Sequence, residues 1–241
     1  MTIKLLSLNI ERDKHIPNVI ALIEKEKPEV ICLQEVQEPD FEMLKKRFDF
    51  QGIFVSMMTY KRISAGKQTL VKQGNIIFTT LNLLKTESFF YFGKGNSPPY
   101  KGSNSCDRVL MASIIEKNGK EYRVTTTHFT WADDGGVNEK QRRDVKKLEE
   151  LLQQKGEMIL CGDFNAPRGR EIFAVLNHYL KDNIPPHIKT TLDPKIHHAG
   201  PLPYVVDYIW STPKYSVRNV RVVDGVSDHM AILAEIEKVD L

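Results

Sequence analysis

The sequence has few of the features that mark membrane or secreted proteins. None of its apolar runs approaches the roughly 20 residues that a helix needs to span a bilayer. The chain enters a strand-like segment almost at once, which leaves no room for the apolar region of a signal peptide. No repeat, linker or low-complexity tract interrupts it. We therefore expect a cytoplasmic protein with no membrane span, and we expect it to be a monomer.

Cysteine and unbalanced charge are also scarce. The three cysteines, Cys32, Cys106 and Cys161, are an odd number, and two of them lie inside apolar strand-like runs. Such cysteines are typical of buried thiols in a reducing compartment. Lysine and arginine together number 34 against 31 acidic residues, a formal net charge of +3. This charge favours an anionic partner only mildly and falls short of the strongly basic face of a dedicated DNA-binding module.

What is present fits a single folded domain. Hydrophobic residues make up 41% of the chain and charged residues 27%, which is ordinary for a globular protein with a substantial core. A length of 241 residues would allow two domains. Folds built as sandwiches often form one domain at roughly 200 to 250 residues, so we predict one domain over residues 1–241.

Hydrophobic periodicity predicts alternating strands and helices. The pattern opens with a strand, a helix and a strand, a βαβ-like start. Asn118-Gly119 predicts a hairpin turn, and four basic residues between 60 and 74 predict a basic loop. This order favours an α/β fold with a mixed sheet. The predicted strands are 3–10, 30–35, 51–60, 74–79, 88–92, 108–116, 121–129, 205–211, 216–223 and 230–237, the predicted helices are 15–27, 41–48, 138–154 and 168–179, and the basic loop contains Lys61, Arg62, Lys67 and Lys72.

The stretch 158–165 carries the first candidate site. Four apolar residues predict a buried strand, and Gly162 is expected to break it where Asp163 and Asn165 emerge. Alternation along an extended chain points Asp163 and Asn165 to the same side. An Asp can take a proton or hold a cation, and an Asn offers a neutral donor and acceptor. The same residues also favour a simple turn, and this stretch alone does not separate the two interpretations.

Other polar residues stand at predicted strand ends in the same way. In chain order the motifs are Leu-Asn, Leu-Gln-Glu, Thr-His, Gly-Asp-Phe-Asn, Val-Asp-Tyr-Ile and Ser-Asp-His. Together they resemble the signature of the endonuclease/exonuclease/phosphatase family, which has the DNase I-like fold. The matches run from Asn9 to His229, so the resemblance covers nearly the whole chain. The polar residues in these motifs are Asn9, Gln34, Glu35, His128, Asp163, Asn165, Asp207, Asp228 and His229.

The resemblance implies a specific architecture and activity. The expected fold is a four-layer α/β sandwich, with two mixed β-sheets packed face to face, helices outside, and the active site at one edge where loops of both sheets meet. The expected activity is hydrolysis of a phosphate ester, which requires charge neutralisation, a nucleophile and stabilisation of a leaving oxygen. Mg²⁺ prefers a few oxygen ligands and keeps several waters. By resemblance Glu35 and Asn9 bind Mg²⁺ or Mn²⁺, and Asp228 contributes to the same site or to a second one.

The remaining roles also follow from the resemblance. Asp163 is the candidate base for the attacking water, and Asn165 is expected to steady the phosphate or the water. His229 would donate to a phosphoryl oxygen as a cation, because a carboxylate paired with its far ring nitrogen favours the charged form. The family implies that Asp207 is this carboxylate. His128 is expected to touch the phosphate or the leaving side.

Other residues leave alternatives open. Arg108 is expected to bind the substrate phosphate, and the alternative is a surface salt bridge with Asp107 or a neighbour. His197 and His198 look like a metal pair, but no Cys or carboxylate stands at ligand spacing, so we interpret them as loop residues. Further candidates of this lower rank are Trp131, expected in the core or at the rim, and Gln141 and Arg142, which could brace the site.

Departures from the family patterns leave the subfamily open. Asn9 is followed by Ile10 and Glu11, where abasic-site endonucleases usually show a Gly and an Asp, and His128 replaces their Tyr. The leading hypothesis is a metal-dependent phosphoesterase acting on a phosphodiester of a nucleic acid or nucleotide-like substrate. The alternatives are a phosphatase of a phosphorylated small molecule or lipid headgroup, and a non-catalytic phosphate-binding scaffold.

Overall fold

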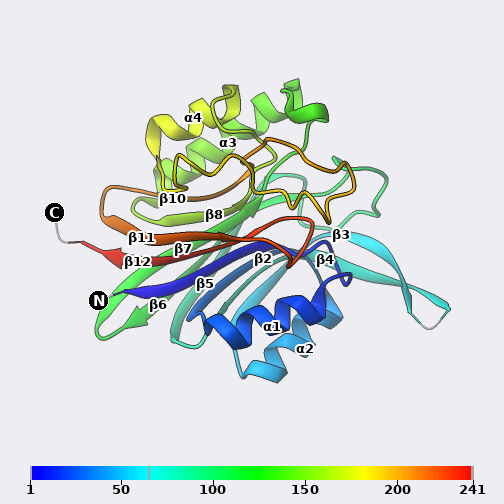
Figure 1. Ribbon diagram of the computed structural model, residues 1–241, viewed down its shortest axis with the longest axis horizontal. Coiled ribbons are helices and arrows are strands. Elements are labelled where there is room, and N and C mark those ends of the chain that lie inside the picture. The colour runs from blue at the N-terminus through cyan, green and yellow to red at the C-terminus, as the bar shows by residue number, and fades with distance from the viewer. Residues whose placement is uncertain (1, 65, 240–241) are drawn as a thin grey trace.

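Two six-stranded sheets pack face to face in the computed structural model, which describes residues 2–64 and 66–239 (Figure 1). The first sheet, sheet A, comprises β1 (Ile3–Asn9), β2 (Val30–Gln37), β3 (Gln51–Ser64), β4 (Lys67–Thr79), β11 (Tyr215–Val223) and β12 (Ala231–Lys238). The second, sheet B, comprises β5 (Asn82–Phe92), β6 (Arg108–Lys117), β7 (Lys120–His128), β8 (Ile159–Asp163), β9 (Lys181–Asp182) and β10 (Asp207–Ser211). The strand orders are β11-β12-β1-β2-β4-β3 and β5-β6-β7-β8-β10-β9.

Helices cover the two outer faces of this pair of sheets. The helices are α1 (Ile16–Glu26), α2 (Glu38–Phe48), α3 (Glu139–Lys155) and α4 (Glu171–Tyr179), with a 3-10 turn η1 (Asp133–Gly135). One apolar cluster, which includes Val19 of α1, joins α1 and α2 to the outer face of sheet A, for example where Phe41 of α2 stacks on Phe78 of β4. A second cluster fills the space between the sheets and continues under α3 and α4. The four-layer sandwich is therefore confirmed.

Both sheets are mixed, as predicted. β1 and β2 pair in parallel in sheet A, and β7 and β8 pair in parallel in sheet B, while the other neighbours are antiparallel. The βαβ start is confirmed, because β1 and β2 are adjacent and parallel with α1 between them in the chain. The Asn118-Gly119 hairpin is confirmed too, since Lys117 pairs with Lys120 across it.

The prediction of a basic loop between residues 60 and 74 is wrong. These residues belong to β3 and β4, which pair in register out to Ser64 and Lys67 and project as a long hairpin from the sandwich (Figure 1). The outer part of this hairpin leaves the core, so polar and apolar residues mix on both of its faces and the period-2 signal of a strand is lost. The four residues concerned are Lys61, Arg62, Lys67 and Lys72.

Gly162 does not break its strand, contrary to expectation. It lies inside β8, which runs on to Asp163. A Cβ at Gly162 would lie 2.0 Å from the carbonyl oxygen of Thr127, and the residue has a φ of +134°. Glycine is therefore needed because two backbones approach closely beside the site, rather than because the strand ends there.

Two expectations about cysteine and membranes can be compared with the structure. Cys32, Cys106 and Cys161 are buried and carry free thiols. Burial raises the pKa of the Cys32 thiol well above its usual range, and the neighbouring Cys161 raises it further. None of the helices in the described part of the chain is long and apolar enough to cross a membrane.

Candidate active site

A cleft of about 210 Å³ gathers almost all of the predicted site residues. They come from segments spread over the whole chain, yet eight of the nine line this one cleft. The ninth, Asp207, lies behind His229, to which it is hydrogen-bonded. The eight are Asn9, Glu35, Arg108, His128, Asp163, Asn165, Asp228 and His229.

Sheet B supplies a row of three side chains at one level. Asp163 at the end of β8 pairs in register with His128 at the end of β7 and with Asp207 at the start of β10. Directly opposed residues in a sheet point to the same face. That face is the one turned to sheet A, since Gln34 of β2 donates from Nε2 to Oγ1 of Thr126, two residues before His128, at 3.1 Å. Strand register thus sets three titratable groups side by side.

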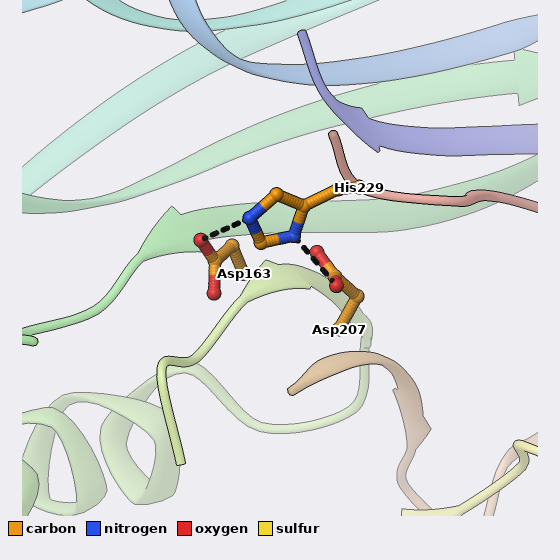
Figure 2. A group of neighbouring side chains, drawn as sticks. All are labelled: Asp163, Asp207 and His229. Atoms are coloured by element: carbon orange, nitrogen blue, oxygen red, sulfur yellow. Dashed lines mark hydrogen bonds and ion pairs between the residues drawn. The ribbon is translucent and has the colours of Figure 1, made fainter. Parts of the chain in front are cut away.

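Asp163 contacts three of the other predicted site residues in this cleft through one carboxylate oxygen. Its Oδ2 accepts a hydrogen bond from Nδ2 of Asn9 at 3.1 Å, which links sheet B to sheet A. The same oxygen lies 3.5 Å from Nε2 of His128 and 3.8 Å from Nε2 of His229. Figure 2 shows His229 between Asp163 and Asp207, with one ring nitrogen toward each carboxylate. A buried carboxylate flanked by three donors can orient a water or take a proton from it.

Asn165 forms a turn and also lines the cleft, so both interpretations of the Gly-Asp-x-Asn stretch hold. Its backbone N–H donates to Oδ1 of Asp163 at 2.8 Å, and its φ of 48° is left-handed. Such a side-chain turn is what Asp and Asn favour. Its side-chain Nδ2 donates to the carbonyl of Phe129 at 3.1 Å. The side-chain Nε2 of Gln141 donates to the backbone carbonyl of Asn165 and so braces the turn. The turn orients the amide, whose Nδ2 has a second N–H to offer a phosphate oxygen.

His229 is held as a cation. Its Nδ1 lies 2.9 Å from Oδ2 of Asp207, in a buried pair. Burial alone would lower the pKa of His229, but the charges of Asp207 and Asp163 outweigh it and hold that pKa well above the usual range. With one nitrogen fixed on Asp207, the other nitrogen carries a proton toward Asp163 and the cleft. It can donate this hydrogen bond to an anion.

His128 is in the opposite state. It is buried too, but its burial lowers its pKa to about 4, because the pull of Asp163 is offset by the nearby positive charges of Arg108 and His229. No second carboxylate within the described residues backs its ring as Asp207 backs His229. His128 is therefore a neutral imidazole near pH 7, which makes it a hydrogen-bonding group in the cleft rather than a fixed charge.

A β-bulge turns Glu35 into the cleft. In a regular strand Glu35 would point to the helical side, because its neighbour Gln34 faces sheet B. The register shifts between Leu33 and Val36, and Glu35 adopts a left-handed φ of 59°. Bulges often re-aim side chains next to active sites, and left-handed non-glycine residues cluster there. The carboxylate then lies 3.3 Å from Nδ2 of Asn9.

The donor set on this side of the cleft fits a hard divalent cation. Glu35 and Asp228 both line the cleft. Burial raises the pKa of Glu35, and the negative charge of Asp228 raises it further, although the positive charge of Arg12 acts in the opposite direction. A cation between the two carboxylates would remove this repulsion, and oxygen ligands are those that Mg²⁺ or Mn²⁺ prefers. Asn9 takes a different orientation from the one expected of a ligand, since its Oδ1 accepts the N–H of Glu11 at 3.1 Å and its Nδ2 faces the carboxylates.

A second group of possible ligands, Asp163, Asp207 and His229, has side-chain atoms within 4.8 Å of one another. Both ring nitrogens of His229 face carboxylates, and the resulting positive ring has no lone pair to offer a metal. This group is better described as a hydrogen-bonded chain of two carboxylates and an imidazolium. The residues of the cleft whose donors fit a divalent cation are Glu35 and Asp228.

Arg108 is a buried cation rather than a surface one. It is only 1% exposed, and its guanidinium donates to the carbonyls of His128 at 3.0 Å and Ser103 at 2.9 Å. The alternative of a surface salt bridge with Asp107 is wrong, because that carboxylate accepts the backbone N–H groups of Lys94 and Ser97. Within the described chain Arg108 has no carboxylate partner, and its Nε is buried without a hydrogen bond. A buried cation without a counter-ion favours an anionic ligand.

The cleft also contains residues that the sequence did not point to. Arg12, in a left-handed conformation, donates to the hydroxyl of Tyr60 at 3.1 Å and stacks over its ring, and Tyr60 packs against Tyr100. Tyr60 ends the predicted strand 51–60 and so shared the strand-end position of the motif residues, whereas Tyr100 gave no such signal. The cleft-lining residues outside the prediction are Arg12, Met58, Tyr60, Gln73, Tyr100, Ser103 and Cys106.

Three residues of lower rank also reach the cleft, and two, Gln141 and Arg142, do not line it. Trp131 is 38% exposed and lines it, in agreement with a position at the rim. His197 and His198, interpreted from sequence as loop residues, line it as well, with ring centroids 4.6 Å apart. Arg142 is partly exposed and pairs with Glu171, away from the cleft.

Comparisons with known proteins agree with this arrangement. The family model described as "Endonuclease/Exonuclease/phosphatase family" matches residues 6–229. An endonuclease/exonuclease/phosphatase from Bacteroides vulgatus superposes with a TM-score of 0.74 at 18% identity, covering 99% of both chains. A mannosyl-6-phosphatase from Bacteroides thetaiotaomicron gives 0.70 at 14% identity, covering 98% of this chain and 99% of its own. TDP2 of D. rerio, in complex with a single-strand DNA product, gives 0.65 at 18% identity, with the same coverage. No curated protein sequence matches the chain.

The structural likenesses establish the fold. The family match covers almost all of the chain, including every motif from β1 to the segment before β12. This protein belongs to the endonuclease/exonuclease/phosphatase family of phosphoesterases.

Proposed function

We propose that this protein is a Mg²⁺- or Mn²⁺-dependent hydrolase that cleaves a phosphodiester in a nucleic acid or nucleotide-like substrate. The observation that carries the proposal is that one cleft brings together two carboxylates, Glu35 and Asp228, two cations, Arg108 and His229, and the buried carboxylate of Asp163. Hydrolysis of an anionic phosphate ester needs such a set, because carboxylates would hold a divalent metal ion while the cations bind the phosphate.

The metal-binding residues would be Glu35 and Asp228, with Asn9 orienting Glu35 and Asp163 through its amide. A divalent ion held there supplies charge neutralisation at the phosphate and favours deprotonation of water. Asp163 is the base in this proposal. It orients the attacking water through Oδ2 and receives its proton, while the N–H of Asn165 keeps the carboxylate in place.

The cationic and hydrogen-bonding groups of the cleft stabilise the negative charge that develops on the phosphoryl oxygens. His229 donates the proton on Nε2, and Asp207 fixes its ring and its charge. The side-chain amide of Asn165 and the guanidinium of Arg108 contribute to binding the phosphate, and the neutral His128 hydrogen-bonds on the same side. Donors that are already in place cost no reorganisation when the charge forms.

The test is a substrate panel with and without Mg²⁺. It comprises bis-p-nitrophenyl phosphate, p-nitrophenyl phosphate, and single- and double-stranded DNA and RNA. We expect turnover of the diester and of at least one nucleic acid, and loss of this turnover in EDTA. Turnover of the monoester alone would identify a phosphatase, a class that includes the mannosyl-6-phosphatase of similar fold. No turnover of any member, with no binding of Mg²⁺, would identify a phosphate-binding scaffold.

The cellular setting is part of the same proposal. The three buried, free thiols fit a reducing compartment, so we propose that the protein acts as a monomer in the cytoplasm.

A further inference from the structure

A second cavity adjoins the catalytic cleft. It has a volume of about 220 Å³ and shares with the cleft Trp131, Asn165, His197, His198 and His229. These shared residues include two of the groups proposed to contact the phosphate, Asn165 and His229. A ligand whose phosphate is held there can therefore extend into the second cavity without leaving the protein surface.

The two cavities differ in chemistry. The catalytic cleft is lined by two arginines, Arg12 and Arg108, whereas the second cavity is lined by no lysine or arginine. Its walls beyond the shared residues are largely apolar or aromatic, as in Leu202 and Tyr204, and Asp134 is the one carboxylate residue among them. Such walls suit an uncharged group and offer nothing to a second phosphate. Water occupies about 30 Å³ per molecule in the liquid, so the cavity has room for several waters or one ring system.

Trp131 is an aromatic surface already in position. Its backbone is fixed, because its N–H donates to Asn104 and its carbonyl accepts from Asn104 and Asn138. Its side chain is 38% exposed, and no other ring or cation stacks on it in the described part of the chain. A rigid, exposed indole can stack on a planar ring with little loss of entropy.

Tyr204 forms a fixed wall of the same cavity. Its hydroxyl donates to the carbonyl of Asp134 at 3.3 Å, and the guanidinium of Arg170 lies 4.8 Å from its ring centroid. Asp134 also lines the cavity, and its charge alone would attract a positively charged ligand such as a quaternary ammonium group. The cation of Arg170 behind this wall, which donates to the carbonyl of Asp134, opposes that attraction. It leaves a neutral planar group as the favoured occupant.

We infer that this second cavity is a subsite for a neutral planar ring of nucleobase size, joined to the phosphate that Asn165 and His229 hold. The inference rests on the proposed function and deepens it, because it assigns the substrate to nucleotide-type phosphate esters and excludes bare sugar phosphates and choline phosphates.

Equilibrium binding tests the subsite without requiring turnover. Isothermal titration calorimetry with Mg²⁺ present would compare thymidine 5′-monophosphate, ribose 5-phosphate and phosphocholine. Stacking of one base on an aromatic side chain predicts that the thymidine nucleotide binds about 10-fold tighter than either other probe. Equal affinities of the three probes, or tightest binding of phosphocholine, would overturn the subsite.

Two variants locate the ring. Leu202 lines the second cavity but not the catalytic cleft, so Leu202→Trp fills the cavity without replacing a residue of the proposed chemistry, and Trp131→Ala removes the stacking surface. Each should reduce the affinity for the thymidine nucleotide to that for ribose 5-phosphate, whose own affinity should change less than about twofold. Leu84→Trp is the matched control, because Leu84 is 46% exposed on β5 and lines neither cavity. A nucleotide preference that survives in both test variants would place the ring elsewhere, for instance beside Tyr100, and refute the inference.

The binding experiment and the turnover experiment test the subsite and the proposed function separately. A protein that hydrolyses diesters but binds the thymidine nucleotide no tighter than ribose 5-phosphate retains the proposed function and loses the subsite. A protein that binds the nucleotide with the expected sensitivity to Leu202→Trp but turns over no phosphate ester retains the subsite and loses the proposed function.

Discussion

Two imidazoles, those of His128 and His229, lie near the same oxygen of Asp163, and they differ in their next charged neighbour. Behind His229 lies Asp207, and its charge keeps that ring positive against the effect of burial. Beside His128 lies Arg108. Burial, together with the positive charge of Arg108, lowers the pKa of His128 and keeps that ring neutral. Both rings are buried, and both lie near the carboxylate of Asp163. The comparison shows that the charge of a buried histidine is set by its second neighbour, so that one carboxylate can have a neutral and a charged imidazole beside it.

The largest expected effect comes from removing the carboxylate that the two histidines share. Asp163→Ala should lower kcat by about 10⁴-fold, because general-base catalysis and water orientation are lost together. Substrate binding should persist, since Arg108, Asn165 and His229 remain. Single-turnover kinetics with a diester, combined with a binding assay, would measure both. Activity within about tenfold of wild type would show that another group is the base.

Removal of the charged imidazole should cost less. His229→Gln keeps a hydrogen-bond donor but loses the positive charge, and we expect kcat to fall by about 10²- to 10³-fold, as for loss of one preorganised donor. Steady-state kinetics on the same diester would measure this. An effect no larger than that of the corresponding change at His128 would contradict the division of roles between the two rings.

The support behind the charged ring comes next. Asp207→Asn keeps the size of the side chain and removes the charge, so we expect a loss of about 10- to 100-fold, smaller than for His229→Gln, because the ring itself remains. Asp207 acts through His229, so the double variant should be no worse than His229→Gln alone. A double-mutant cycle on kcat checks this, and additive losses would show that Asp207 has a separate role.

The smallest loss of activity should follow from changing the neutral imidazole. We expect His128→Gln to lower kcat/KM by about tenfold, because a neutral hydrogen-bonding group is exchanged for another neutral group. Activity measured beside His229→Gln under identical conditions gives the ratio directly. His187→Gln, at an exposed position that does not line the cleft, is the matched control.

The neutral state of His128 also predicts a pH dependence of stability. Its pKa is about 4 in the fold against an ordinary 6.5, so between these values the unfolded chain binds a proton that the folded chain excludes. The resulting stability is fully present above pH 6.5 and is lost as the pH falls toward 4, by about 3 kcal/mol in all. The free energy of unfolding of His128→Gln should therefore fall less over this window than that of wild type. Parallel curves from urea titrations would refute the neutral assignment.

Sequence reasoning was strongest where the chain is regular. Register carries Asp163, His128 and Asp207 to one level once their strands are assigned, so motifs at strand ends were enough to find them. The polar residues of these motifs lie at the ends of buried apolar runs, which is a local and visible pattern.

What escaped prediction depends on departures from regular structure or on contacts between distant segments. The bulge at Glu35 reverses the side on which alternation would place that side chain, and no local pattern marks it. The burial of Arg108 depends on carbonyls of Ser103 and His128, and Tyr100 reaches the cleft from a loop rich in Gly, Pro and Ser. Such positions are set by tertiary packing rather than by sequence periodicity.

The hydrogen bond from Asn9 to Asp163 has a consequence for how the protein can change. It joins an amide on one sheet to the carboxylate on the other, so the reacting groups stay aligned only while the two layers keep their relative position. Substitutions deep in the apolar layer between the sheets, far from any ligand, could slide one layer by a fraction of an ångström and impair turnover while the molecule stays folded. Variation in this buried layer is then a means of tuning rate separately from fold.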